Sequence, residues 1–70
     1  MKLADYENAI LDFTETIQRN EKFYLAYYYK GICLESSGKN ELAKEIYRKG
    51  LKVTPQSETE IISHIHKRLR

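Results

Sequence analysis

The chain has one cysteine, one proline, three glycines and no tryptophan among its 70 residues. A single cysteine excludes a disulfide framework, and no Cys/His spacing indicates a zinc site. No apolar run approaches the roughly 20 residues that cross a bilayer, and no signal-peptide pattern opens the sequence. These absences predict one small domain without a membrane span, and we expect it to reside in the cytoplasm.

Residues that carry out catalysis or hold cofactors are equally scarce. His64 and His66 are two positions apart, so on a helix their side chains point about 200° from each other, whereas metal-binding pairs need a spacing of three or four. Cys33 lies within an apolar run, which is typical of a small buried core residue. The glycines are too dispersed to form a phosphate loop. We therefore predict no enzymatic activity, no metal and no cofactor.

Charge is nearly balanced in total but unevenly distributed. Residues 1–35 carry four Lys/Arg and six Asp/Glu, whereas residues 36–70 carry eight and four. A basic C-terminus such as Lys67, Arg68 and Arg70 occurs in proteins that bind nucleic acid or acidic membranes. Cations also favour the C-terminal end of a helix dipole, and here they are not interleaved with aromatic side chains, as a single-stranded nucleic-acid platform requires. We therefore favour the helix-end explanation.

Apolar residues recur at helical spacing along most of the chain and predict helices over about 4–19, 22–36, 40–53 and 58–69. The second run ends before Gly38, a residue suited to the position just past a helix. The third stops before Pro55, and Ser57 with Glu60 forms a capping box for the fourth. The expected inward-facing residues are, in the first helix, Leu3, Tyr6, Ile10, Phe13 and Ile17; in the third, Leu42, Ala43, Ile46, Tyr47 and Leu51; and in the fourth, Ile61, Ile62, Ile65 and Leu69.

The sequence also repeats itself. A shift of 34 residues aligns four pairs of equal or similar residues, Glu7 with Glu41, Ala9 with Ala43, Phe13 with Tyr47 and Ile17 with Leu51. The tetratricopeptide repeat has a 34-residue unit with the pattern W-x2-L-G-x2-Y, then A-x3-F, then P. This chain resembles that family through Tyr27-x2-Lys30-Gly31-x2-Leu34, Ala43-x3-Tyr47 and Pro55, all in register.

The resemblance implies an all-α fold in which antiparallel helical hairpins stack as a tetratricopeptide-like right-handed solenoid. Residues 1–21 would be the second helix of a partial repeat, 22–57 one full repeat, and 58–70 a terminal or capping helix within a single domain, 1–70. Lys30, Gly50 and Ile65 depart from the family pattern, where leucine, alanine and glycine are usual. Ile65 in the glycine position favours a cap over a true repeat helix.

The spacing also has a physical basis. Gly31 and Ala43 are small, which lets two helices cross closely, and Tyr27, Leu34, Ile46 and Tyr47 are large enough to fill the space around that crossing. A single hairpin leaves an apolar face uncovered, and stacked neighbours normally cover it. The chain is therefore either a fragment of a longer array or a protein that completes itself with a second copy.

In this family the first helix of each repeat lines the concave face. The corresponding residues are the predicted partner-binding set: Leu25, Tyr28, Tyr29, Ile32, Glu35, Ile62, His66 and Leu69, with Ser63 beside them. Tyrosines suit a contact surface because they offer a large area at low entropic cost. The same residues would serve equally well to pack a neighbouring helix. The resemblance thus implies a module that binds a peptide or protein, and the alternative is a structural or self-assembling segment, including a homodimer.

Some chaperone-binding members of the family hold a partner's C-terminal carboxylates with Lys, Asn and Arg. The asparagine position falls on Tyr29 and two cationic positions fall on Thr59 and Ser63. This carboxylate clamp is missing, so we do not predict binding to acidic chaperone C-termini.

Overall fold

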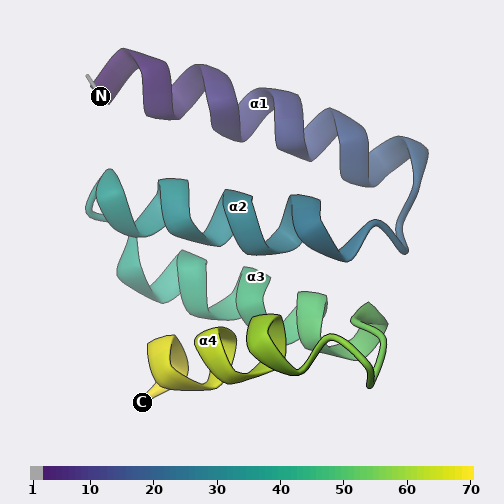
Figure 1. The fold of residues 1–70 in the computed structure, drawn as a ribbon. Coiled ribbons are helices and arrows are strands. Elements are labelled where there is room, and N and C mark those ends of the chain that lie inside the picture. Colours follow the sequence, from purple (N-terminus) through teal and green to yellow (C-terminus); the bar gives the residue numbers. More distant parts are fainter. Residues whose placement is uncertain (1–2) are drawn as a thin grey trace.

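The computed structural model describes residues 3–70, and the side chains from residue 5 onward. It contains four helices, α1 (Leu3–Arg19), α2 (Tyr24–Ser36), α3 (Asn40–Val53) and α4 (Thr59–Leu69), and no strand within the described residues (Figure 1). The all-α prediction is confirmed, and the predicted helix bounds differ from these by two residues or fewer.

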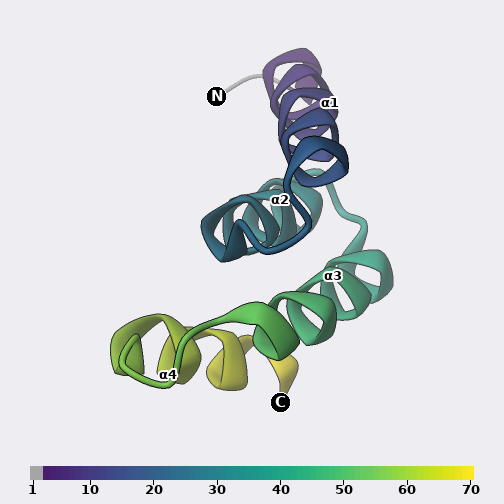
Figure 2. The ribbon, with the colours of Figure 1, turned by 90° about the vertical axis from the view of Figure 1, so that its right-hand side faces the viewer.

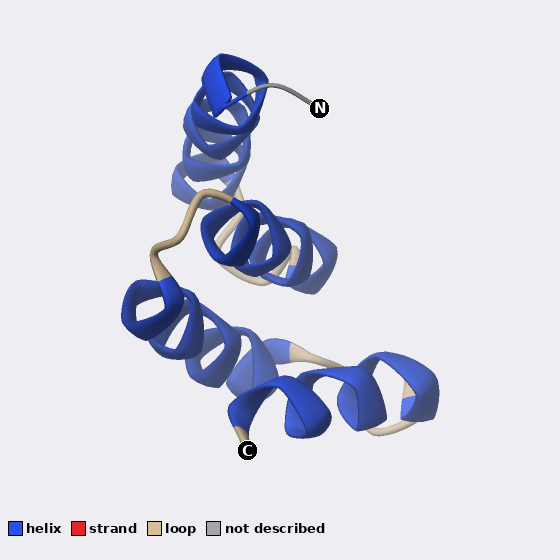
Figure 3. Ribbon diagram, turned by 90° about the vertical axis from the view of Figure 1, so that its left-hand side faces the viewer, coloured by secondary structure: helices blue, strands red, loops and turns tan. Residues whose placement is uncertain are grey.

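The helices follow one another as antiparallel neighbours joined by short turns (Figure 1). Seen from the side, α2 and α4 lie on one side of the molecule, and α1 and α3 on the other (Figures 2 and 3). Helix α2 lies between α1 and α3 and packs against both. This arrangement fits a helical repeat.

Local sequence explains where the helices end. After α2, Gly38 has φ +86°, and the amides of Ser37, Gly38 and Lys39 donate to carbonyls of the last turn. Glycine takes this left-handed conformation without a side-chain penalty, as the sequence predicts. After α3, Thr54 turns extended in front of Pro55, and its buried hydroxyl donates to the Gly50 carbonyl at 2.7 Å.

The start of α4 differs from the prediction. Helix α4 begins at Thr59, the residue before it is Glu58, and no side-chain hydrogen bond caps it. The predicted capping box of Ser57 and Glu60 is therefore wrong. The reason is the turn that follows α3, in which the Glu58 amide donates to the Pro55 carbonyl at 3.0 Å. That turn includes Ser57 and moves the first helical residue past it.

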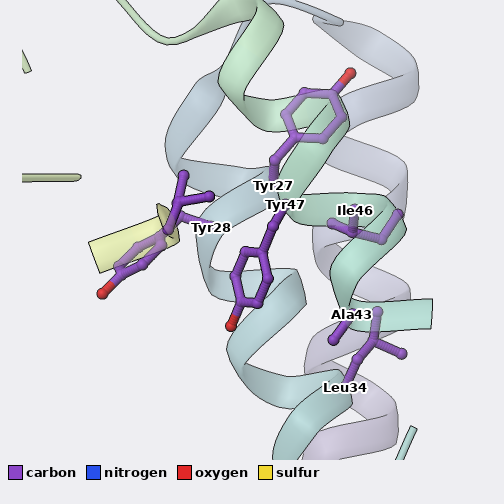
Figure 4. Packing of buried hydrophobic residues seen from close by; sticks show 7 residues of the cluster. Tyr27, Tyr28, Leu34, Ala43, Ile46 and Tyr47 are labelled. Carbon is purple, nitrogen blue, oxygen red and sulfur yellow. The ribbon is translucent and has the colours of Figure 1, made fainter. Parts of the chain in front are cut away.

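The core lies where α2 crosses α3 (Figure 4). Tyr47 and Ala43 are fully buried, and Leu34 is nearly so. A Cβ placed on Gly31 would overlap the Tyr47 ring, 2.6 Å from its Cδ1. The predicted close crossing at Gly31 and Ala43 is therefore confirmed, with Tyr27, Leu34, Ile46 and Tyr47 buried around it.

Two other expectations about the core concern Leu42 in α3 and the inward-facing residues of α1. Leu42 is 45% exposed, so its predicted inward position is wrong. It precedes Ala43 on the helix and lies about 100° away from it, outside the face that α2 covers. In α1, Ile10 and Ile17 pack against the core, and Tyr6 and Phe13 are half-buried. The predicted inward position of Leu3 concerns a side chain outside the described residues.

None of the described helices is long and apolar enough to cross a membrane.

Candidate protein-interaction site

Large apolar side chains are exposed in a hollow between α1 and α2. It has a volume of about 270 Å³ and is lined by Phe13, Thr16, Phe23, Leu25, Ala26 and Tyr29. Phe23 is 44% exposed and Tyr29 is 46% exposed. The Phe13 ring stacks on the Tyr29 ring with centroids 6.0 Å apart. The hollow therefore offers an aromatic, partly open surface that another chain can contact.

Beyond this hollow, α2 is joined to α4 by polar contacts. The Tyr28 hydroxyl lies 3.0 Å from His64 Nδ1, and Arg68 Nη1 donates to Glu35 Oε2 at 2.6 Å. Both pairs join residues more than 30 positions apart in the sequence. Sequence reasoning missed the structural roles of His64 and Arg68. Their spacing of four, which places them on one face of α4, is the signal that could have suggested a shared contact.

The predicted partner-binding residues do not all lie at the hollow. Leu25 and Tyr29 line the hollow together. Tyr28 is only 8% exposed, so little of its side chain is open to a partner. Its ring lies 6.4 Å from that of Tyr47, and its hydroxyl faces α4. Glu35 is half-buried and paired with Arg68.

The remaining predicted residues are distributed differently. Ile32 and Leu69 are half-buried and pack against the core, whereas Ile62 is half-buried and His66 exposed. The helical spacing places Ile62 and His66 on the opposite side of Ile65 from the contacts with α2. The structure therefore does not bring Ile62 and His66 together with Leu25 and Tyr29 in the hollow.

Burial changes the protonation behaviour of several side chains. Burial, reinforced by the neighbouring Glu35 carboxylate, raises the pKa of Tyr47 well above its usual range. The Tyr47 hydroxyl and Glu35 Oε1 are both buried without a well-formed hydrogen bond. Burial also raises the pKa of the Cys33 thiol, which keeps it in the unreactive form. Near the surface, hydrogen bonding to Glu58 raises the pKa of Tyr24.

Metal-binding arrangements are absent from the described part of the chain. No group of three or more His, Cys, Asp or Glu side chains there lies close enough to hold a metal ion. The nitrogen Nδ1 of His64 is engaged with the Tyr28 hydroxyl. The described surface offers apolar contact at the hollow, hydrogen bonding and ion pairing.

The fold and this surface define a class: an all-helical repeat built from antiparallel hairpins. In sequence, 66 residues of the chain, 94% of its length, are 29% identical to human tetratricopeptide repeat protein 12. The chain spans 9% of that protein's length. No family model matches the chain, and no solved structure matches it.

The predicted resemblance to the tetratricopeptide repeat family is confirmed by this similarity together with the all-helical, repeat-like structure. The name of this relative describes it as a tetratricopeptide repeat protein.

Proposed function

We propose that this chain is a protein–protein interaction module that binds a peptide or protein partner and catalyses no reaction. The observation that carries the proposal is the pair of exposed aromatic residues, Phe23 and Tyr29, around one hollow. By contrast, three other aromatic side chains, Tyr27, Tyr28 and Tyr47, are buried in the core. Exposed apolar surface of this kind, gathered around a hollow, is typical of interaction sites.

In this proposal Leu25 and Tyr29 make the central partner contacts, and Ile32 supports them from the core side. The predicted residues of α4, Ile62, His66 and Leu69, extend the surface if the helices continue a right-handed solenoid. Tyr28 and Glu35 act indirectly, because they fix α4 against α2. Thr59 and Ser63 are exposed and uncharged, so we propose no carboxylate clamp. A cytoplasmic location stays a prediction.

Site-specific photo-crosslinking tests this function. A photoreactive phenylalanine at position 23 should give adducts with a partner in a cell extract, and excess unlabelled chain should suppress them. The Tyr29→Asp chain should suppress them poorly. The matched control is the same probe at Leu42, which is as exposed as Tyr29 but does not line the hollow. Equal adducts at both positions, or none at position 23, would count against an interaction site here.

Self-assembly is a second candidate, because the same exposed aromatic residues could be covered by a second copy. Twofold dimers are the commonest homo-oligomers. Light scattering of the purified chain separates the two candidates. A mass of two chains that falls to one chain with Tyr29→Asp supports self-assembly, whereas the mass of one chain at high concentration favours a different partner.

A further inference from the structure

Helices α1 and α3 are copies of one another under the shift of 34 residues, and this correspondence shows what the open face of α1 is built to receive. Helix α2 covers one face of α3, consisting of Ala43, Ile46, Tyr47 and Gly50, all of them buried. The corresponding residues of α1 are Ala9, Asp12, Phe13 and Thr16. Asp12 is exposed and the other three are half-buried. Within the described residues, α1 has a neighbouring helix only on the side of α2 (Figure 2), and of this face the Phe13 ring stacks on Tyr29 of α2.

The way α2 packs on α3 defines the complementary pattern. Gly31 lies under the Tyr47 ring, and a Cβ on Gly50 would lie 2.7 Å from Tyr27 Cβ. Large and small residues thus alternate across the crossing, with a large residue on α2 four positions before a small one. A helix that carries this pattern can place its small residue over Phe13. Its large residue would then lie beside Thr16, where the hollow opens.

Charge distinguishes the α1 face from its copy. Where α2 packs on α3, Lys30 of α2 lies near Lys49 of α3. Burial of Lys30, together with the like charge of Lys49, lowers the pKa of Lys30. In α1 the counterpart of Lys49 is Glu15, and the counterpart of Ile46 is Asp12. Glu15 pairs with Arg19, while Asp12 takes part in none of the ion pairs found among the described residues. A lysine that is repelled on α3 would therefore be attracted on α1.

We propose that the α1 face formed by Ala9, Asp12, Phe13 and Thr16, with the adjoining hollow, docks an amphipathic α-helix of another polypeptide. That helix carries a large apolar residue, a basic residue three positions later and a small residue next to it. The basic residue meets Asp12 and Glu15, the small residue admits the Phe13 ring, and the large residue enters the hollow. This inference rests on the proposed function and names the kind of partner.

The test uses the whole chain and a synthetic helical peptide with Tyr, Lys, Gly and Leu at the spacing of Tyr27, Lys30, Gly31 and Leu34. Two control peptides replace the Gly with Leu or the Lys with Glu. Chain variants are Asp12→Lys and, as a control with the same charge change, Glu7→Lys. Both sites are exposed on α1, but Glu7 lies on the opposite side of the helix from Asp12. Binding is measured by fluorescence anisotropy, after circular dichroism has verified folding.

We expect the Lys peptide to bind the parent chain and the Gly→Leu peptide to bind at least tenfold more weakly, since overpacking prevents the close approach. Asp12→Lys should weaken binding of the Lys peptide about two- to fivefold, the range for a partly exposed ion pair. The same variant should strengthen binding of the Glu peptide, and Glu7→Lys should change the affinity of neither peptide. Equal binding of the Gly and Leu peptides, or equal effects of Asp12→Lys and Glu7→Lys, overturns the proposal.

Three further outcomes separate this inference from the proposed function. Crosslinks at position 23 together with peptides that do not bind would overturn the helix proposal and leave the interaction module standing. Dimers that Tyr29→Asp dissociates, and with which the Lys peptide does not compete, would identify a second copy as the occupant and also overturn it. Peptide binding that responds to the charge changes, but without partner adducts at position 23, would support the docking face and overturn only the claim that the exposed aromatic residues around position 23 make the partner contacts.

Discussion

The ring of Tyr47 lies directly over the Cα of Gly31, so closely that no Cβ fits between them. Tyr47 is fully buried and cannot swing into solvent. The contact joins the middle of α2 to the middle of α3, where the two helices cross (Figure 4). The absence of a methyl group at position 31 therefore sets how closely α2 and α3 approach each other.

Gly31→Ala should destabilise the chain by about 1–3 kcal/mol, the range for overpacking a filled core. This loss of stability from overpacking outweighs the roughly 1 kcal/mol by which alanine stabilises a helix relative to glycine. Urea unfolding followed by circular dichroism measures it. Gln18→Ala, at an exposed position of α1, should change stability by no more than about 0.5 kcal/mol. A Gly31→Ala chain as stable as its parent would contradict the packing described above.

The pair formed by Tyr28 and His64 should couple α4 to α2. A double-mutant cycle with Tyr28→Phe and His64→Ala should give a coupling free energy of about 0.5–1.5 kcal/mol, the net value of one partly buried hydrogen bond. Amide hydrogen exchange should show faster exchange in α4 in either single variant, with α3 less affected. Additive effects of the two substitutions would mean that the hydroxyl and the ring nitrogen do not interact in solution.

Sequence reasoning recovered the helices and their central crossing because both depend on strong local signals. Gly31, Ala43 and Tyr47 occur at fixed spacings that only a close helix pair explains. The capping of α4 was missed because the turn after Pro55 competes for the residues that would form the cap. The free energies of capping and of turn formation are both small, and a shift of one residue in the turn is enough to move Ser57 out of the capping position.

The candidate site was predicted only in part, for a geometric reason. Tyr28 and Tyr29 are neighbours of the same type, and which one is buried depends on where α4 lies. A side chain of α4, His64, attracts Tyr28 inward, while Tyr29 stacks on Phe13 at the edge of the hollow. Helical periodicity alone places both on the same broad face. The position of α4 is a tertiary property, and the spacing of His64 and Arg68 indicates only that they share a face, not which side chains of α2 they contact.

The buried Tyr47 hydroxyl should make stability sensitive to alkaline pH. Because its pKa is raised in the folded chain, the stability contribution is complete below the ordinary tyrosine value of 10.0 and is lost progressively as pH rises from that value toward the raised pKa of the folded chain. Above that value the unfolded chain releases the proton while the folded chain retains it, at a cost of up to about 1.4 kcal/mol per pH unit. Urea unfolding between about pH 9 and pH 11 should show this decline, and Tyr47→Phe should reduce its slope. An unchanged slope would show that Tyr47 is not responsible.

Separate substitutions of the two neighbouring tyrosines should distinguish folding from binding. Tyr28→Asp places an unpaired carboxylate in a buried position and removes the contact with His64, so it should cost more than about 3 kcal/mol. Tyr29→Asp loses mainly the stacking on Phe13 and should cost about 1 kcal/mol. Thermal unfolding followed by circular dichroism measures both.

The binding measurements then complete the argument. Tyr29→Asp should remain folded and yet lose the ability to compete for partner adducts at position 23, because its side chain lies in the hollow. Leu42→Asp provides the matched control, since Leu42 is exposed to the same extent but on α3. It should remain folded and compete as well as the parent chain. If Tyr29→Asp unfolds the chain as completely as Tyr28→Asp, then Tyr29 is a core residue, and the exposed aromatic surface between α1 and α2 cannot be the binding site.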